Sequence, residues 1–284
     1  MKKRNSRNSI VHKAILLTIL AVGMIPLFYF ATIEIQLAQA YTESDVSIMD
    51  DTSTVNRHVR NVAFGVGEKL SFDINYGFIN AGTATMEVVR LIEYEERPCY
   101  QVVTRALSNR FFSSFYKVDD RVESVIDAAG LYSWRFEKKL REGSYSSDRV
   151  HTIDHDRGLA FYQSDTIEVP PFIQDALSVL YYVRTQALEV GQSVMVDNFT
   201  DGKHYPLEVR VLGKESVSVD AGKFDCIVVE PLLRSVGVFR HEGRLKVWLT
   251  DDRLKLPVLM KSKVLVGSIS AELTDYELGD IEVF

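Results

Sequence analysis

The sequence predicts a mainly β protein, in which a curved antiparallel sheet or half-barrel meander carries one packed helix at about residues 172–189. Three observations predict this class. Segments with apolar residues at every second position recur along most of the chain, as half-buried strands require. Short breaks that contain Gly, Asp and Asn separate them, which favours hairpin links between antiparallel neighbours. A single segment has helical periodicity.

The first 40 residues are typical of an export signal. Residues 1–13 contain several Lys and Arg residues and no acidic residue, and residues 14–33 form an apolar run. Ala38 and Ala40 then occupy the small-residue positions that a signal peptidase reads. We predict a signal peptide over residues 1–40, cleavage after Ala40, and an exported, periplasmic protein. The apolar run is also long enough to span a bilayer, so an uncleaved N-terminal anchor is the alternative.

The next segment, residues 41–61, mixes polar residues without periodicity, and we predict a flexible leader. The whole chain has a formal net charge of −6, and loss of the basic N-terminus would leave the remainder more acidic. Such a chain lacks the basic surface that binds nucleic acid and would be repelled by anionic lipid. We therefore expect no nucleic-acid partner, and membrane contact only through the N-terminal segment if that segment is retained.

Strands are predicted over most of residues 62–169. The segment "KLSFDINYG" alternates Leu70, Phe72, Ile74 and Tyr76 with polar residues, the period-2 pattern of a half-buried strand. The segments "AGTATMEVVRLIEY", "CYQVVTRAL", "RVESVID", "LYSWRFEKKLREG" and "DRVHTIDHDRGLAFYQ" continue the pattern. Turn-forming Gly, Asp and Asn residues lie between them, so we expect an antiparallel meander.

One helix is predicted after Pro170 and Pro171 stop the last of these strands. In "FIQDALSVLYYVRTQALEVG" the apolar residues share one helical face, Asp175 lies early, and Gly191 follows the end. A helix of about four to five turns would cover one face of a curved sheet. Residues 62–284 are then one β-rich domain, or two halves, 62–169 and 191–284, around the helix.

Further strands follow the helix in "YPLEVRVLG", "FDCIVVEPLL" and "GRLKVWLT". The acid pair Asp251 and Asp252 then stands between "LKVWLT" and "LPVLMKSKVLVG", two alternating segments. Asp is favoured in hairpin bends because its side chain accepts hydrogen bonds from nearby backbone amides. No His or third acid follows within a few residues to complete a catalytic or metal-binding set. We interpret the pair as a bend.

Several segments together resemble a known family. They are "GEKLSFDINYGFINAGTATMEV", "SNRFFSSFYKVDDRVESVIDAAGL", "QDALSVLYYVRTQALEVGQ", "DGKHYPLEVRVLGKESVSVDAGKFDCIVVEP" and "LKVWLTDDRLKLPVLMKSKVLVGSISAEL". In this order, from about Gly67 to Tyr276, they resemble the bacterial exported-protein family called domain of unknown function 3108. The resemblance implies an exported protein of antiparallel strands and brings no established activity. More distantly, the chain looks like the half-barrel carriers of periplasmic lipoproteins, and such a likeness of fold does not give function.

Two cysteines, Cys99 and Cys226, lie in strand-like segments. In an oxidising compartment they are candidates for a disulfide, and in strands each would equally serve as a small buried hydrophobic residue. The sequence leaves both readings open.

Candidate catalytic and metal-binding residues are few. His151 and His155, with Asp154 and Asp156, would be informative as ligands on a helix, but here they run from a strand into a turn. The charges of Asp119, Asp120, Arg121 and Glu123 are explained by a solvent-facing strand. No serine stands in a nucleophile elbow. We therefore expect no enzymatic activity, no metal site and no cofactor.

Aromatic residues are the remaining indication of function. Most belong to the core, as in any β domain. If the curved sheet leaves an apolar groove beneath the helix, Trp134, Tyr181 and Trp248 are the residues that we expect to line it and contact the ligand. The leading hypothesis is an envelope protein that binds a lipid or lipoprotein-like ligand there and performs no chemistry. The alternatives are an envelope assembly factor that binds a partner protein without a cavity, or a hydrolase of envelope glycans or lipids.

Overall fold

The structure, a computed structural model, describes residues 57–233, 245–263, 267–282 and 284. The predicted signal peptide, with the alternative anchor, and residues 41–56 of the predicted leader lie outside the described residues. Within the described part of the chain, no helix is long and apolar enough to cross a membrane.

Fourteen strands form one sheet, in the order β8-β7-β6-β5-β4-β3-β2-β1-β14-β13-β12-β11-β10-β9. Each named pair is antiparallel, so the predicted fold class is confirmed. The strands are β1 (Lys69–Tyr76), β2 (Ile79–Tyr94), β3 (Arg97–Ser108), β4 (Asp119–Asp127), β5 (Ser133–Glu142), β6 (Tyr145–Asp154), β7 (Leu159–Tyr162), β8 (Asp165–Glu168), β9 (Ser193–Thr200), β10 (Lys203–Val219), β11 (Gly222–Leu233), β12 (Leu245–Thr250), β13 (Pro257–Lys263) and β14 (Ser268–Glu277).

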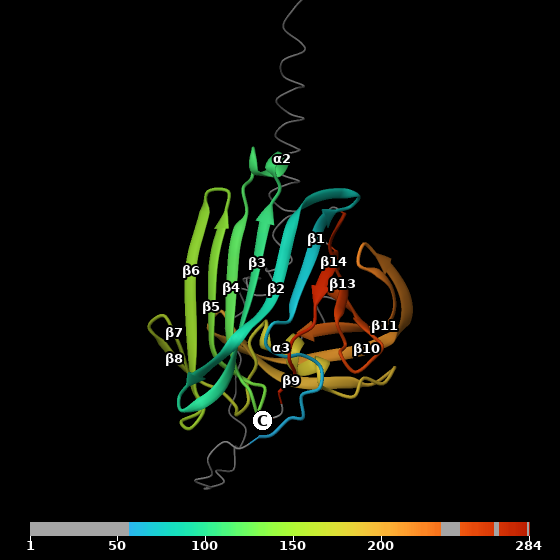
Figure 1. The fold of residues 1–284 in the computed structure, drawn as a ribbon. Coiled ribbons are helices and arrows are strands. Elements are labelled where there is room, and N and C mark those ends of the chain that lie inside the picture. The colour runs from blue at the N-terminus through green and yellow to red at the C-terminus, as the bar shows by residue number, and fades with distance from the viewer. Residues whose placement is uncertain (1–56, 234–244, 264–266, 283) are drawn as a thin grey trace, which may run out of the picture.

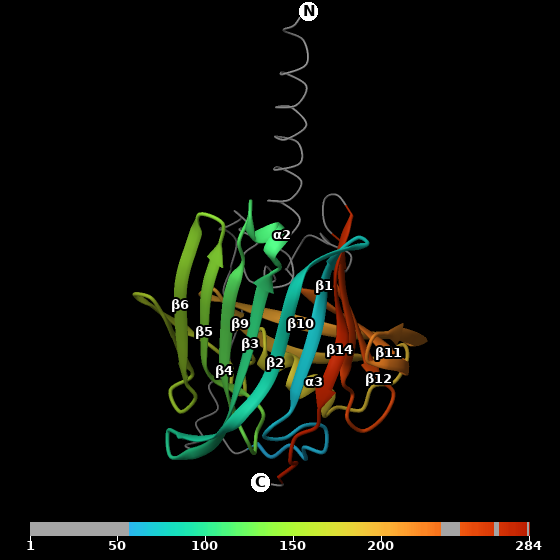
Figure 2. The same ribbon diagram turned by 45° about the horizontal axis from the view of Figure 1, so that its top comes forward.

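The sheet folds over on itself. Strands β1–β6 form one wall, and β9–β11 run across behind it at a steep inclination (Figures 1 and 2). Strands β1–β8 come from residues 62–169 and β9–β14 from residues 191–284, and the pairing of β1 with β14 joins the two groups into a single sheet. The fold thereby brings the inner faces of the two groups toward each other.

A short connection links the two ends of the sheet. Ile173 accepts a hydrogen bond from the backbone N–H of Ser133 at the start of β5, at 3.1 Å. Gln174 donates to Asp197 at 2.8 Å and accepts from Phe199 at 2.7 Å, both on β9. We call residues 173–174 the seam, because they contact both walls where the end strands β8 and β9 do not pair with each other.

The helix of the predicted segment is shorter than expected. Helix α3 (Ser178–Arg184) covers the middle of residues 172–189. Its start is set by Asp175, whose Oδ1 accepts from the backbone N–H groups of Leu177 and Ser178, both at 2.7 Å. Ile173 and Gln174 remain extended because the seam takes up their backbone groups. Tertiary hydrogen bonding therefore overrides the helical periodicity of the first turn.

A second short helix, α2 (Arg110–Ser113), was not expected from the sequence. It lies between β3 and β4, at the end of the molecule where the β1–β2 hairpin turns (Figure 1). Asn109 caps it by accepting from the backbone N–H of Phe112 at 3.0 Å. The Nδ2 of Asn109 also donates to the backbone oxygen of Asn80 at 2.7 Å, which ties α2 to the hairpin.

Helix α3 is anchored by a buried ion pair. The guanidinium of Arg184, which is 0% exposed, donates to both carboxylate oxygens of Glu68 at 2.7 Å. It also donates to the backbone oxygens of Ala63, at 3.0 Å, and Leu254, at 3.1 Å. These four bonds connect α3 to the segment before β1 and to the bend between β12 and β13.

Candidate functional site

The space between the two walls is a cavity of about 190 Å³. Strands of both groups line it, and α3 lies against it. Both walls contribute apolar side chains. Phe72, Met86 and Phe136 line the cavity from β1, β2 and β5, and Leu207, Val247 and Met260 line it from β10, β12 and β13. The cavity is therefore a largely apolar space lined by both walls of one folded sheet and by α3.

Strand alternation explains the apolar walls. Leu207 and Val209 on β10 are two residues apart and both line the cavity, as do Leu245 and Val247 on β12. Residues two apart on a strand point to the same face, so each apolar stripe contributes several side chains to the wall.

Helix α3 contributes its own apolar face. Val179, Leu180 and Val183 line the cavity together with Leu177 just before the helix. These positions follow the i, i+3, i+4 spacing that places side chains on one side of a helix. Val179 and Leu180 are only half-buried, so they present apolar surface that a ligand would cover.

The cavity is suited to part of an apolar chain. An engineered apolar cavity of about 150 Å³ stays dry and takes up benzene, whereas pockets for drug-sized ligands measure roughly 300–1,000 Å³. By comparison with the cavity that takes up benzene, 190 Å³ holds a chain segment of about six carbon atoms.

One charged residue interrupts the apolar wall. Lys138 on β5 lines the cavity with its side chain only 4% exposed, and its Nζ forms an ion pair with Asp201 at 2.6 Å. Burial lowers the pKa of Lys138, and the neighbouring carboxylate of Asp201 opposes this effect. Asn198 and Thr200 on β9 also line the cavity, and Thr200 Oγ1 donates to Asn198 Oδ1 at 2.9 Å.

The sequence signal for Lys138 was present. Phe136, Lys138 and Leu140 are at alternate positions of β5, and all three are buried. Period-2 alternation therefore assigns Lys138 to the buried face, although the adjacent Lys139 lies on the opposite face. The contact with Asp201 could not be found this way, because it joins residues 63 positions apart.

Trp134 is buried away from the cavity wall. It lies at the start of β5, where the register against β4 shifts beside Val125. Its ring packs with Cys99, Val125 and Tyr132, and its Nε1 donates to Asp127 at 3.2 Å. Because of the register shift, Trp134 lies on the same side of the sheet as Val125, and Val125 does not line the cavity.

Tyr181 lies on the side of α3 that faces away from the cavity. Its ring packs edge-on against Phe64 at a centroid distance of 4.8 Å, and the guanidinium of Arg184 stacks 5.4 Å from its centroid. Leu180 and Val183 occupy the cavity side instead. Tyr181 therefore packs α3 against Phe64 and does not contact the cavity.

Trp248 alternates with Val247 on β12, and Val247 is the one that lines the cavity. Trp248 packs with Cys226 and Val228 and donates from Nε1 to Glu215 at 2.8 Å. The structure thus places Trp134, Tyr181 and Trp248 in three separate clusters, none of them on the cavity wall.

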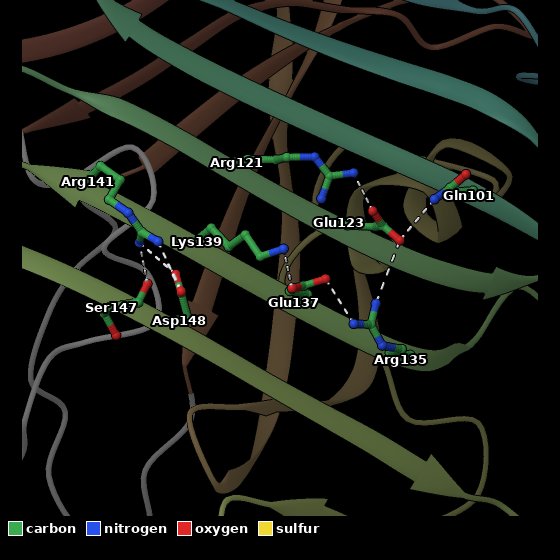
Figure 3. A network of polar contacts seen from close by, with 9 residues as sticks. All are labelled: Gln101, Arg121, Glu123, Arg135, Glu137, Lys139, Arg141, Ser147 and Asp148. Carbon is green, nitrogen blue, oxygen red and sulfur yellow. Dashed lines mark hydrogen bonds and ion pairs between the residues drawn. The ribbon is translucent and has the colours of Figure 1, made fainter.

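The opposite face of β3–β6 is polar. Figure 3 shows Glu123 between Arg121 and Arg135, with Gln101 Nε2 donating to Glu123 at 3.0 Å. Glu137, two residues from Arg135, accepts from it at 2.9 Å. These neighbours lower the pKa of Glu123, although burial opposes them. The solvent-face interpretation holds for Arg121, which is partly exposed, but not for Glu123, which is only 8% exposed beneath its ion pairs.

The same interpretation is wrong for Asp120, which is 3% exposed. Asp120 and Glu142 share a hydrogen bond, and burial together with the Asp120 carboxyl raises the pKa of Glu142 to about 7. Asp120 Oδ1 also accepts from the backbone N–H of Arg141 at 2.7 Å. Strand parity explains the error, since Asp120 is two residues before Val122 and shares its inward face.

Replacing Glu142 by Gln is expected to stabilise the protein at high pH. Because the pKa of Glu142 is raised from 4.5 to about 7, its contribution to stability is full below about pH 4.5 and is lost as pH rises through about 7. At about pH 8, Glu142→Gln should unfold with a free energy about 2 kcal/mol higher than the unaltered protein, and near pH 4.5 the two should agree. Urea unfolding at both pH values measures this, and equal stabilities at pH 8 would contradict it.

The two histidines considered as ligands are packed among aromatic rings. His151 lies 5.2 Å from Phe136 and 4.9 Å from Phe199 between ring centroids, and burial lowers its pKa to about 3. His155 packs on Trp134 at 4.7 Å in the turn that follows β6. Among the described residues, no group of three or more His, Cys, Asp or Glu side chains is arranged to hold a metal ion.

The remaining sequence questions are answered by local geometry. Asp252 Oδ1 accepts from Thr250 Oγ1 and from the backbone N–H groups of Leu254 and Lys255, at 2.8–3.0 Å, so the hairpin bend is confirmed. Cys99 and Cys226 are buried free thiols in different clusters and form no disulfide. Burial raises the pKa of the Cys99 thiol to about 12.

Solved structures that are similar to this chain include one that shares its fold. A β-barrel-like protein of domain of unknown function DUF1849 from Brucella abortus has a TM-score of 0.53 at 13% identity, covering 77% of this chain and 100% of its own. A candidate lipoprotein from Parabacteroides distasonis has a TM-score of 0.34 at 9% identity, covering 78% and 100%. A candidate exported protein with a YmcC-like fold from Bacteroides fragilis has a TM-score of 0.31 at 11% identity, covering 78% and 99%.

No protein with a curated description matches this chain. The sequence profile of the family described as "Protein of unknown function (DUF3108)" matches residues 71–274, which include most of the strands and α3. The resemblance drawn from the sequence is thereby confirmed, and the chain belongs to the DUF3108 family.

Proposed function

We propose that this protein is an exported, periplasmic envelope protein that binds the apolar chain of a lipid or lipoprotein in the cavity of its folded sheet and catalyses no reaction. The observation that carries the proposal is the apolar cavity between the two walls. Natural ligand sites are concave, mostly apolar and provided with a few polar groups, and this cavity has that composition.

The energetics support reversible binding. Burial of a methylene group contributes about 0.8 kcal/mol, so a segment of about six such groups would gain about 5 kcal/mol before the costs of association. A longer chain that extends beyond the cavity would cover further apolar surface. Because association itself costs about 4 kcal/mol or more, the segment in the cavity alone would bind weakly, and the further covered surface would give the reversible affinity that a carrier or sensor needs.

The side chains around the cavity also favour binding without chemistry. Among the described residues that line it, Lys138 is the one ionisable group. Its Nζ is paired with Asp201 rather than with a nucleophile or a second acid or base. General acid–base or nucleophilic catalysis requires such a convergent set, and none is found at the cavity among the described residues.

Enlarging a lining residue is expected to abolish binding. Val179→Phe would place a ring in the cavity from the half-buried face of α3, and the affinity for 1-octanol should fall by about tenfold or more, because the space for the chain is lost. NMR titration of the purified protein with octanol measures this affinity. The matched control is Val150→Phe on β6, where the side chain is exposed and lies away from the cavity, and it should bind as the unaltered protein does.

Native mass spectrometry of the protein purified from a periplasm, followed by solvent extraction, tests for a natural ligand. A stoichiometric extra mass that extracts as a lipid would support the proposal. No extra mass, together with no octanol binding or with equal octanol binding by Val179→Phe, would reject the cavity as the functional site.

If the cavity is rejected, an exposed apolar surface favours the alternative of an envelope assembly factor that binds a partner protein. Exposed apolar side chains gather where α2 meets the β1–β2 hairpin, among them Phe78, which is fully exposed, and Phe111, which is 68% exposed. Isolated proteins seldom expose aromatic clusters without a partner. Crosslinking from this end of the molecule in the cell envelope would then identify the partner protein.

A further inference from the structure

Apart from Thr85 on β2, the polar residues that line the cavity are gathered on one part of its wall. Thr104, Val122 and Lys138 are direct cross-strand neighbours on β3, β4 and β5, and all three line the cavity. Asn198 and Thr200 reach the same part from β9, because the residue after Thr200 is Asp201, the partner of Lys138. We call Thr104, Lys138, Asn198 and Thr200 the polar corner. The rest of the wall, toward α3, is apolar.

Thr104 has an unused hydrogen-bonding group in this corner. Its side chain is 3% exposed, and its Oγ1 has no hydrogen-bond partner among the described residues. A buried hydroxyl without a partner is unfavourable, so nearly all such groups in native proteins are paired with protein, water or ligand. The Thr104 hydroxyl is therefore available as a donor to a polar group inside the cavity.

Beside the polar corner, positive charges outnumber the one carboxylate that they share. Asp201 is paired with Lys138 at 2.6 Å and with Arg149 at 3.6 Å, so two cations share one carboxylate. Lys138 and Arg149 are themselves cross-strand neighbours on β5 and β6. In the part of the chain that the structure describes, no carboxylate lines the cavity. An anion placed beside the Lys138 ammonium would balance this charge.

We propose that the cavity takes a single-chain amphiphile with an anionic head group, a carboxylate or a phosphate. The head group lies at the polar corner, where it accepts hydrogen bonds from Lys138 and Thr104, and the apolar chain runs toward α3. This inference rests on the proposed function and adds the class of ligand and its orientation. Charge-assisted hydrogen bonds in a buried site are about twice as strong as neutral ones, so the head group would decide selectivity.

The test compares three probes with the same chain: 1-octanol, octanoate and octyl phosphate. Octanol measures binding to the apolar cavity alone, and the two anions measure the head-group contact. At pH 7 octanoate or octyl phosphate should bind about tenfold more tightly than octanol. The tighter of the two identifies whether a carboxylate or a phosphate is preferred. Octanol binding without any preference for the anions would overturn this inference and leave the proposed function intact.

Two variants move the anion affinity in opposite directions. Lys138→Met removes the ammonium, so the anion and octanol should bind with about equal affinity, while Arg149 still pairs with Asp201. Asp201→Asn removes the competing carboxylate and should increase anion affinity by about threefold or more, with octanol affinity unchanged. Unchanged anion affinity in Asp201→Asn would contradict the proposal even if Lys138→Met failed to fold.

Discussion

Glu68→Gln is expected to lower the free energy of unfolding by about 3–5 kcal/mol, because it leaves the charge of Arg184 buried without a counter-ion. Arg184 is fully buried and Glu68 is 1% exposed, so water cannot replace the lost carboxylate. Arginine does not deprotonate in proteins, and the charge therefore cannot be removed by a pKa shift. For a domain of this size the loss corresponds to a melting temperature lower by about 10 °C.

Two comparisons isolate the cause of this loss. Asp148→Asn breaks the exposed ion pair between Asp148 and Arg141, whose side chains are 56% and 43% exposed, and should change stability far less, because solvent screens this pair. The double variant Glu68→Leu, Arg184→Met removes both charges and should be more stable than Glu68→Gln alone. Urea unfolding measures all three. A loss in Glu68→Gln no greater than that in Asp148→Asn would show that the buried pair does not anchor α3.

Asp175→Ala is expected to lower the free energy of unfolding by about 3–4 kcal/mol, because one buried carboxylate satisfies four donors. Its Oδ2 accepts from Ser124 Oγ at 2.6 Å and Ser133 Oγ at 2.5 Å. Its Oδ1 accepts from the backbone N–H groups of Leu177 and Ser178 at the start of α3. Removal of the carboxylate leaves these donors unpaired and creates a small void.

The matched control is Asp175→Asn, which keeps one oxygen for the two backbone N–H groups and places an amide near the two serine hydroxyls, which can accept. Its loss should be less than half that of Asp175→Ala. Thermal unfolding compares the two variants, and octanol titration of the folded fraction reports whether α3 still closes the cavity. Equal losses would mean that the packing of Asp175, rather than its hydrogen bonds, matters.

The strands were predictable because alternation is a local property. Val247 and Trp248 show what alternation can predict. Their positions on opposite faces of β12 follow from the sequence, whereas the cavity itself forms only when the sheet folds over. Leu245, Val247 and Leu249 form an apolar face of β12, whereas Trp248 lies between Lys246 and Thr250 on the other face. Alternation therefore favoured the face of Val247 over that of Trp248. The choice of aromatic residues as ligand contacts relied on residue type alone, whereas the cavity is lined mainly by aliphatic side chains.

Features set by contacts between distant residues escaped prediction. Trp134 lies at a register shift that depends on the pairing of β5 with β4, and period-2 counting fails across such a shift. Gln174 belongs to a helix by periodicity, yet its backbone pairs with β9. The polar corner combines Lys138 on β5 with Asn198 and Thr200 on β9, and only the folded sheet brings these strands together.

The pairing of β1 with β14 has a consequence for how the chain is made. Lys69 pairs with Glu277, so about 200 residues must be added after β1 before its second neighbour exists. At about 5–20 residues per second, synthesis leaves this strand edge without its partner for roughly 10–40 s. An unpaired edge is a template for association with other chains. The edge of β1 in the growing polypeptide is therefore open to association with other chains until the last strand has emerged.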